Sequence, residues 1–250
     1  AGNIVALSSR TLEKAREKAA QWNIPVAYGS HRELLGDENV NIVYISTINA
    51  QHYVWAKAAL AHNKHVVCEK PCTTTAAQTR ELFALAREKG LFLMEAEKML
   101  FLPALLEVKQ SIDRGELGDI HMAQLSHSFP ASYNGWMFDE KAGGGPLLSS
   151  AIYVVELLQF LFDCRVAEIT GHYTKHPGTN VEEQYALSGR MENGVLFSLK
   201  NSTVALMKNG ACFYGEKGYA ELPDYWKARK VIFCDHKETQ VQEFPCEHEL

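Results

Sequence analysis

Two oppositely charged residues, Glu69 and Lys70, directly follow a short β-branched run in the stretch VVCEKP at residues 66–71. Such a run is typical of a buried strand in a parallel sheet. Open parallel sheets bind ligands at the carboxyl ends of their strands, so both charges are predicted to face a ligand. Pro71 biases Lys70 toward an extended conformation, which holds its ammonium at a set angle to the strand. The alternative interpretation is a solvated pair of charges in a surface loop.

Over the first hundred residues the sequence around this stretch alternates short apolar runs with segments of helical periodicity. This rhythm predicts a doubly wound α/β unit with a parallel sheet. Thr11 is a candidate N-cap and Gly90 a candidate C-cap. Strands are expected at residues 4–7, 41–46, 65–69 and 91–96, helices at 11–22, 51–62 and 73–90, and shorter elements at 24–28 and 31–37.

Beyond residue 100 the pattern changes to strand-like segments with few helices between them. This change predicts an α+β domain with a largely antiparallel sheet. The ENG sequence at 192–194 supplies a hairpin turn, and a long helix is expected at 147–162, after the triple glycine at 143–145. A helix is also expected at 103–114 and strands at 120–129, 165–174, 182–191, 194–205 and 210–215.

The composition excludes several classes of protein. With 46% apolar and 22% charged residues the chain has an ordinary globular composition, and a formal charge of −5 without a dense Lys/Arg stripe argues against binding nucleic acid. The apolar stretch 151–162 is too short and too polar to span a membrane.

The six cysteines form no CxxC pair, which favours reduced thiols in the cytoplasm. His65, Cys68 and Cys72 match no common zinc spacing, so no metal site is expected.

A dinucleotide-binding fold begins with a strand and a glycine-rich GxGxxG turn, yet this fingerprint is absent from the sequence. We therefore expect that one strand-turn-helix unit of about 30 residues is missing ahead of residue 1. Without that turn, the usual helix N-terminus for a pyrophosphate is also missing.

Several motifs nevertheless occur in a characteristic order: ISTINAQH, CEKP, MEAEKMLFLPAL, GELGDI and GGGPLLSSAIYVVELLQFLF. From residue 3 to about residue 220 the chain resembles the Gfo/Idh/MocA oxidoreductase family, and within it the dihydrodiol and xylose dehydrogenase-like branch. The resemblance implies a Rossmann-like parallel sheet that lacks its first βα unit and an α+β C-terminal domain with a mostly antiparallel open sheet. The dinucleotide-binding domain would span residues 1–98, and the substrate and oligomerisation domain residues 99–250. A homodimer or homotetramer would form through the C-terminal sheet.

The resemblance also implies roles for residues of the first domain. Lys70 would lie beside the nicotinamide and the substrate hydroxyl, and Glu69 would contact the cofactor ribose. The turn that lines the cofactor would contain Ser46, Thr47, Asn49 and His52.

In the second domain the resemblance points to Tyr153 as the acid/base. Two positions depart from the family pattern: Ser149 replaces an aspartate that helps to orient substrate, and Leu100 replaces a frequent arginine. These departures imply either a substrate less polar than a sugar or an altered or lost activity.

Hydride transfer from a carbinol requires a group that takes the hydroxyl proton, and Tyr153 is the candidate. A free phenol has a pKa of about 10, so titration near neutrality needs a shift worth about 4 kcal/mol. One ammonium at about 4 Å, in an effective dielectric of about 20, supplies an attraction of that order. Lys70 beside Tyr153 would therefore suffice as a proton-transfer pair. The alternative is that Tyr153 is simply a buried residue of an amphipathic helix.

Cofactor choice can be argued from Ser8, Ser9 and Arg10, which follow the strand expected at 4–7. NAD binders usually place Asp or Glu there for the ribose 2′-hydroxyl. Hydroxyls and a guanidinium instead suit a 2′-phosphate, and Arg10 can also stack on adenine. The sequence thus predicts that NADP is preferred over NAD.

The leading hypothesis is an NADP-dependent dehydrogenase acting on a carbinol of a small sugar, cyclic polyol or diol. The alternative is a catalytically silent dinucleotide-sensing regulatory or scaffold protein of the same fold. Ser149 and Leu100 support that alternative, whereas the retention of Lys70 and Tyr153 argues against it.

Overall fold

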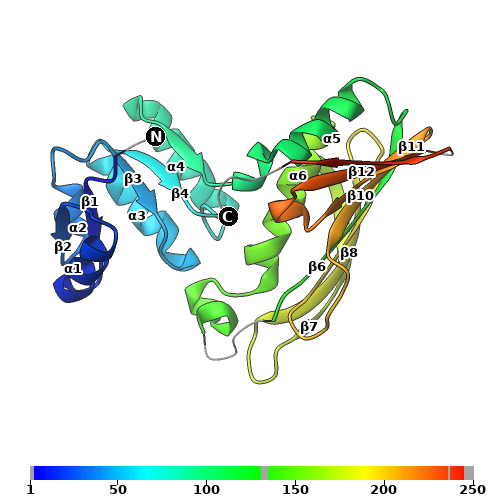
Figure 1. Cartoon of the computed structure of the whole chain (residues 1–250). Helices are drawn as coiled ribbons and strands as arrows, with labels where there is room; N and C mark the ends of the chain where they lie inside the picture. The colour runs from blue at the N-terminus through cyan, green and yellow to red at the C-terminus, as the bar shows by residue number, and fades with distance from the viewer. Residues whose placement is uncertain (1–2, 131–134, 236, 245–250) are drawn as a thin grey trace. The chain divides into compact units, whose positions relative to one another are not determined.

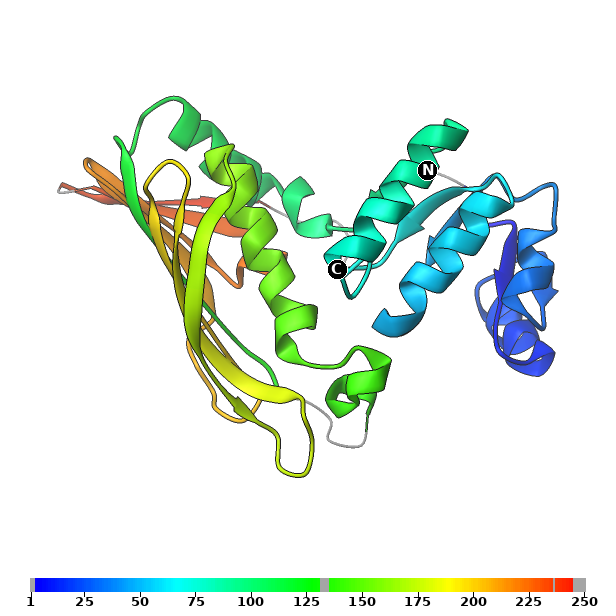
Figure 2. The same cartoon turned by 180° about the vertical axis from the view of Figure 1, so that it is seen from behind.

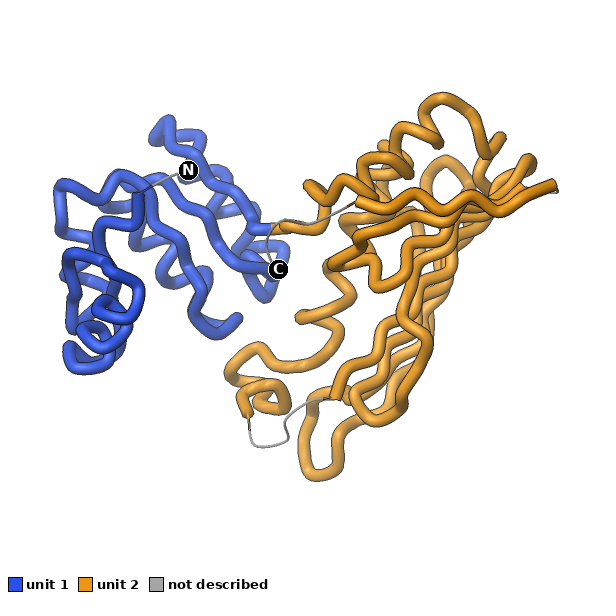
Figure 3. Tube along the Cα trace, in the orientation of Figure 1, with its two compact units in different colours: residues 1–96 blue, residues 97–250 orange. Residues whose placement is uncertain are grey.

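The computed structural model describes residues 3–130, 135–235 and 237–244. The chain divides into two compact units, residues 1–96 and 97–250, which Figure 3 shows in blue and orange.

Unit 1 contains short parallel strands in two separate sheets (Figure 1). In the first, β1 (Ala6–Ser8) pairs with β2 (Val26–Tyr28). The second contains, in spatial order, β3 (Ile42–Ile45), β4 (His65–Cys68) and β5 (Leu93–Glu95). The parallel pairing confirms the predicted fold class.

Helices connect these strands, and their ends follow local capping chemistry. The Thr11 hydroxyl accepts a hydrogen bond from Lys14 N at 3.4 Å, and Gly90 adopts a left-handed conformation with φ 64°. Both predicted caps are therefore confirmed. The helices are α1 (Leu12–Gln21), α2 (His31–Leu35), α3 (Asn49–Ala61) and α4 (Ala76–Lys89).

The core of unit 1 lies where α3 and α4 pack on the second sheet. Small residues such as Ala56 and Ala86 let the helices approach, while Leu60, Leu82 and Val66 are fully buried. The apolar run NIVYIS at 41–46 predicts a buried strand, but Ile42 and Tyr44 are 52% and 58% exposed. Side chains alternate between the two faces of a strand, so Val43 and Ile45 pack on the core cluster while Ile42 and Tyr44 lie on the opposite face and reach solvent.

Unit 2 is built on a mostly antiparallel eight-stranded sheet, as predicted. Its spatial order is β13-β12-β11-β10-β6-β9-β8-β7, and β6 and β9 form a parallel pair within it. The strands are β6 (Ile120–Ser128), β7 (Val166–Lys175), β8 (Glu182–Met191), β9 (Leu196–Ser202), β10 (Gly210–Gly215), β11 (Gly218–Pro223), β12 (Lys230–Asp235) and β13 (Thr239–Glu243). The sequence analysis missed β11 and β12, although the β-branched and aromatic run in KVIFCD is a strand signal.

Two helices, α5 (Pro103–Asp113) and α6 (Ile152–Phe162), cover one face of this sheet (Figures 1 and 2). Leu105 of α5 and Leu157 of α6 are fully buried in the same cluster as Phe213 and Leu199 of the sheet. This apolar packing positions α6. Short helical turns complete the unit: η1 (Lys98–Phe101), η2 (Trp136–Phe138), η3 (Glu140–Ala142), η4 (Leu147–Ala151) and η5 (Tyr225–Lys227).

The helix expected at 147–162 has two parts, because η4 is a π-helical turn that leads into α6. The helical stretch Glu140–Phe162 is long and apolar enough to cross a membrane by length and composition alone. However, Val154, Leu157, Leu158 and Leu161 of α6 are all buried against the sheet. The apolar character of this stretch is accounted for by the core of unit 2.

Candidate active site

Glu69 and Lys70 stand at the carboxyl end of β4, in a loop that backbone groups fix from both neighbouring strands. Glu69 N donates to Ile45 O at 2.9 Å, and Ala96 N donates to Cys68 O at 2.7 Å. On the far side of the loop, Cys72 N donates to the Glu95 carboxylate at 2.6 Å. Lys70 is half-buried and precedes a cis peptide bond to Pro71. The position predicted for both charges at a strand end is confirmed.

The Glu69 carboxylate is held by two donors. Tyr44 OH donates to one of its oxygens, and Lys70 N donates to the other at 3.3 Å. Burial, and then this hydrogen bond to a carboxylate, raise the pKa of the Tyr44 phenol. Tyr44 therefore stays a donor across the physiological range and fixes Glu69.

The loop after β3 carries the next group of candidates. Ser46 is exposed, and Asn49 begins α3 with 5% of its surface exposed. The Thr47 hydroxyl oxygen is buried and has no hydrogen-bond partner among the described residues. An orphaned hydroxyl at the carboxyl end of a parallel strand fits a polar ligand such as a cofactor amide or ribose. His52 is buried at 1% exposure, with both ring nitrogens facing carbonyl oxygens.

Ser8, Ser9 and Arg10 lie at the end of β1, where the guanidinium of Arg10 is exposed. Ser8 Oγ lies 2.8 Å from Nδ1 of His31, which the sequence analysis did not single out. Burial lowers the pKa of His31, whose ring also meets Trp55 edge-on at 4.7 Å. The hydroxyls and the exposed guanidinium fit the ribose end of a dinucleotide.

In unit 2 the triple glycine packs tightly. A Cβ on Gly144 would clash with the Met137 carbonyl, and a Cβ on Gly145, whose φ is 109°, would clash with the Glu182 carboxylate. That carboxylate accepts a hydrogen bond from Leu147 N at 2.7 Å, at the start of the helical segment that leads to Tyr153. Gly144 and Gly145 therefore form a tightly packed turn with no room for a side chain.

The same helical segment carries Ser149 and Tyr153. Ser149 is 8% exposed, and its hydroxyl donates to Gly145 O at 2.8 Å within the π-helical turn. Tyr153 is half-buried in the first turn of α6 and packs against the core of the unit. Both lie on a rigid element rather than on a loop.

Tyr153 has an aromatic neighbourhood. Tyr225 is fully buried, and its pKa is raised first by this burial and then by the nearby Tyr153 and Glu97. His127 of β6 stacks on Trp226 with ring centroids 4.0 Å apart, so it serves the packing of this cluster. Lys70 belongs to unit 1 and Tyr153 to unit 2.

No group of three or more His, Cys, Asp or Glu side chains within the described part of the chain could hold a metal ion.

Comparison with known proteins defines the class. Residues 1–97 match the model of the oxidoreductase family with an NAD-binding Rossmann fold, and residues 105–221 match the GFO/IDH/MocA C-terminal domain. These matches and the two-unit fold define an NAD(P)-dependent oxidoreductase. The chain belongs to the Gfo/Idh/MocA family, as the sequence resemblance predicted.

Curated relatives are similar along almost the whole chain. The trans-1,2-dihydrobenzene-1,2-diol dehydrogenase of Mus musculus is 34% identical over 229 residues, 92% of this chain and 69% of the relative. The Homo sapiens enzyme of the same name is 32% identical over 244 residues, 97% of this chain and 73% of the relative.

Solved structures share the fold at lower identity. An aldose-aldose oxidoreductase from Caulobacter crescentus, complexed with glycerol, superimposes with a TM-score of 0.89 at 21% identity and covers 99% of this chain and 77% of its own. A levoglucosan dehydrogenase in complex with NADH and levoglucosan has a TM-score of 0.88 at 20% identity, covering 96% and 70%.

Proposed function

We propose that the protein transfers a hydride between NADP(H) and a carbinol of a sugar, cyclic polyol or diol. The similarity to curated dehydrogenases carries the proposal, and the position of Lys70 supports it. The chain matches diol dehydrogenases over nine-tenths of its length, and Lys70, at the carboxyl end of β4, stands in a loop fixed from both neighbouring strands. A lysine with no role beyond the protein surface would not need a loop fixed in this way.

Lys70 and Tyr153 are the proposed proton-transfer pair. In oxidation, Tyr153 would take the proton of the substrate hydroxyl, while the Lys70 ammonium favours the charged phenolate by electrostatic attraction. A bound nicotinamide would supply the hydride acceptor. Thr47, Asn49 and Glu69 would line the nicotinamide side, and Ser8, Ser9 and Arg10 the adenine-ribose side. Ser46 would lie in the same cofactor-lining turn, and His52 follows it in the first turn of α3.

The test of this function is the Lys70→Met variant. Turnover of a panel of diols, sugars and polyols is followed by the absorbance of reduced nicotinamide. We expect kcat/KM to fall about 1000-fold, because the ammonium that favours proton transfer is lost. Lys57→Met is the matched control, since Lys57 is an exposed lysine of α3 paired with Glu81. Turnover that survives in Lys70→Met, or is absent from the wild-type protein across the whole panel, would overturn the proposal.

Cofactor preference is a separate part of the proposal. One neighbour of the same fold is a complex with NADH and another, a 3-ketoreductase, a complex with NADP, so the fold alone does not decide. The exposed Arg10 supports a 2′-phosphate. Arg10→Ala should lower the ratio of kcat/KM for NADP to that for NAD by about tenfold, since one charge-assisted hydrogen bond is lost. Arg16→Ala on α1 is the control, and a large wild-type preference for NAD would contradict the inference.

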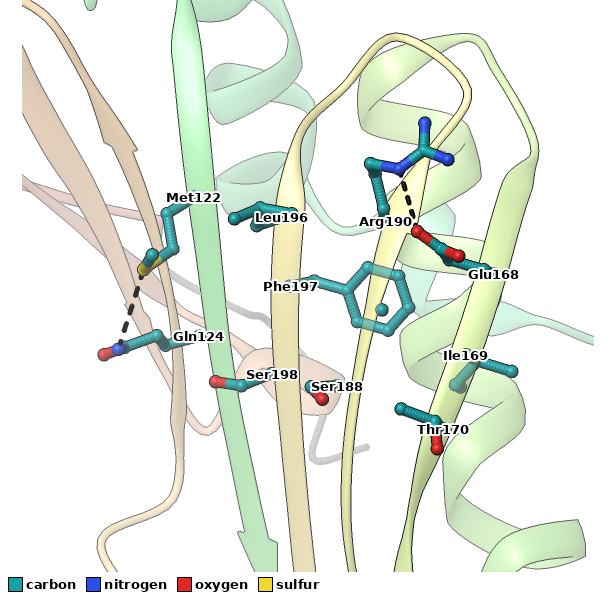
Figure 4. Close-up of a pocket in the computed structure, with 11 residues that line it drawn as sticks. Met122, Gln124, Glu168, Ile169, Thr170, Ser188, Arg190, Leu196, Phe197 and Ser198 are labelled. Atoms are coloured by element: carbon teal, nitrogen blue, oxygen red, sulfur yellow. Dashed lines mark hydrogen bonds and ion pairs between the residues drawn. The ribbon is translucent and has the colours of Figure 1, made fainter.

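The uncovered face of the unit 2 sheet supports the proposed homodimer or homotetramer. A hollow of about 580 Å³ on this face is bordered by Met122, Leu196 and Ile169, which are 40%, 48% and 47% exposed, and by the Arg190–Glu168 ion pair at 2.9 Å (Figure 4). Charged substitutions there, such as Leu196→Arg, should produce monomers in light scattering after gel filtration. A monomeric wild-type protein would contradict this part.

The silent sensor or scaffold protein is the less favoured function, because the curated relatives along this chain are named as dehydrogenases.

A further inference from the structure

His52 connects the two loops that carry the candidate residues of unit 1. Its Nδ1 lies 2.7 Å from Pro71 O, and its Nε2 lies 2.9 Å from Thr47 O. Each carbonyl accepts a hydrogen bond when the nitrogen that faces it carries a proton. A neutral ring has one N–H and donates to one of these two carbonyls, whereas the doubly protonated ring donates to both. In either form the ring lies between the loop after β3 and the loop after β4, and its 1% exposure keeps water from competing for either carbonyl.

The two contacted carbonyls belong to residues beside site groups. Pro71 directly follows Lys70, and Thr47 carries the orphaned buried hydroxyl. The other ties of the Lys70 loop, Glu69 N to Ile45 O and Cys72 N to Glu95, are made to strand residues. Within the described residues, the His52 ring joins the Lys70 loop directly to the Thr47 loop. Movement of this ring would therefore change the distance between the Lys70 and Thr47 loops.

We propose that His52 is a positioning residue that fixes the Lys70 loop relative to the Thr47 loop, rather than a residue whose ring contacts the cofactor. The ring nitrogens are both directed at main-chain carbonyls, which leaves no polar ring atom for a ligand. The catalytic consequence rests on the proposed function, whereas the structural link stands on the geometry alone.

The consequence for catalysis follows from the sensitivity of reacting geometry. A misplacement of about 1 Å in a catalytic group can cost about 100-fold in rate. Loss of the His52 bridge is expected to lower kcat through Lys70, with a smaller effect on the KM of the substrate. A residue that served only the core would lower the amount of folded enzyme and leave kcat per folded molecule unchanged.

The experiment compares His52→Phe, which keeps a ring without donors, with His52→Gln, which keeps an N–H donor. His62→Phe is the matched control, since His62 stands at the end of the same helix, is exposed and contacts Ala58 O of its own helix at 2.8 Å. We expect kcat to fall about 100-fold in His52→Phe, to recover in part in His52→Gln and to stay unchanged in His62→Phe. Equal kcat in His52→Phe and wild type, or no recovery in His52→Gln, would overturn the proposal.

Amide hydrogen exchange measured on the same variants separates this proposal from the dehydrogenase function. Exchange over residues 66–75 should rise in His52→Phe relative to α1 of the same unit, and should stay unchanged in His62→Phe. If the wild-type protein turns over no substrate, the proposed function fails, and this exchange result still decides whether the bridge holds. Unchanged exchange over 66–75, or a uniform rise over the whole of unit 1, would show that His52 does not fix the loop.

Discussion

Lys70 in unit 1 stands in a loop that hydrogen bonds tie to two neighbouring strands, whereas Tyr153 in unit 2 stands on a helix that apolar packing holds against a sheet. The strands of unit 1 are three or four residues long, and its site residues follow them directly. The sheet of unit 2 has strands of up to ten residues and supports α6 from its face. Polar contacts fix the candidate residues of unit 1, and burial fixes those of unit 2.

The two units should therefore respond differently to substitutions. Removing a hydrogen bond in unit 1 should displace a loop while the fold persists, because Leu60 and Leu82 stay buried in the core between α3, α4 and the sheet. Removing apolar volume under α6 should lower the stability of the unit that carries Tyr153. Four substitutions or conditions test the contrast, from the largest expected effect to the smallest.

The largest effect is expected at Tyr153. Tyr153→Phe should lower kcat about 1000-fold with little change in unfolding, because the variant removes only the hydroxyl that we propose carries the proton. Tyr225→Phe is the control, since the Tyr225 hydroxyl is buried and has no hydrogen-bond partner among the described residues. Tyr225→Phe should be active and equally or more stable. The measurement compares kcat of Tyr153→Phe with kcat of Tyr225→Phe. Equal values would show that the Tyr153 hydroxyl does not carry the proton.

Packing under α6 should give the next effect. Leu157 is fully buried, so Leu157→Ala should lower the free energy of unfolding by about 3 kcal/mol. Leu206 is 97% exposed, and Leu206→Ala should leave that free energy unchanged. Urea unfolding followed by circular dichroism checks both variants. A loss well below 1 kcal/mol for Leu157→Ala would mean that apolar packing does not hold α6.

The glycine turn before α6 is the third test. Gly145→Ala should cost about 2 kcal/mol, because the residue has a φ of 109° and its Cβ would clash with Glu182. Gly178→Ala is the control: its φ is 77° and no atom lies within 4 Å of the added Cβ, so about 1 kcal/mol is expected from backbone strain alone. Equal losses in urea unfolding would show that the contact with Glu182 has no role in the turn.

The smallest effect concerns His31 beside Ser8. Burial lowers the pKa of His31 in the folded protein, so below the unfolded value of about 6.5 the unfolded state binds more protons than the folded state. Stability should therefore be complete above about pH 6.5 and fall as the pH drops toward the lowered folded pKa. Unfolding at pH 7.5 and pH 5.5 measures the loss, and His31→Asn should reduce it. An unchanged pH dependence in that variant would assign the loss to other groups.

Much of the fold could be predicted because its signals are local. The Thr11 and Gly90 caps, the β-branched strands of unit 1 and the hairpin glycine Gly194, whose φ is 94°, each depend on residues close in sequence. Other features could not, because they depend on distant partners. The exposure of Ile42 depends on which face of β3 the core cluster covers, and the clash at Gly145 depends on Glu182, which lies 37 residues further along the chain.

The candidate site divides in the same manner. The sequence by itself determined the family, the charge pair Glu69 and Lys70 at a strand end, and the segment that carries Tyr153, because these are properties of residue order and local pattern. Only the tertiary structure decided that Tyr44 holds Glu69 and that His52 bridges Thr47 and Pro71. Such contacts join side chains to partners on neighbouring strands and loops, and their distances exist only after the chain has folded.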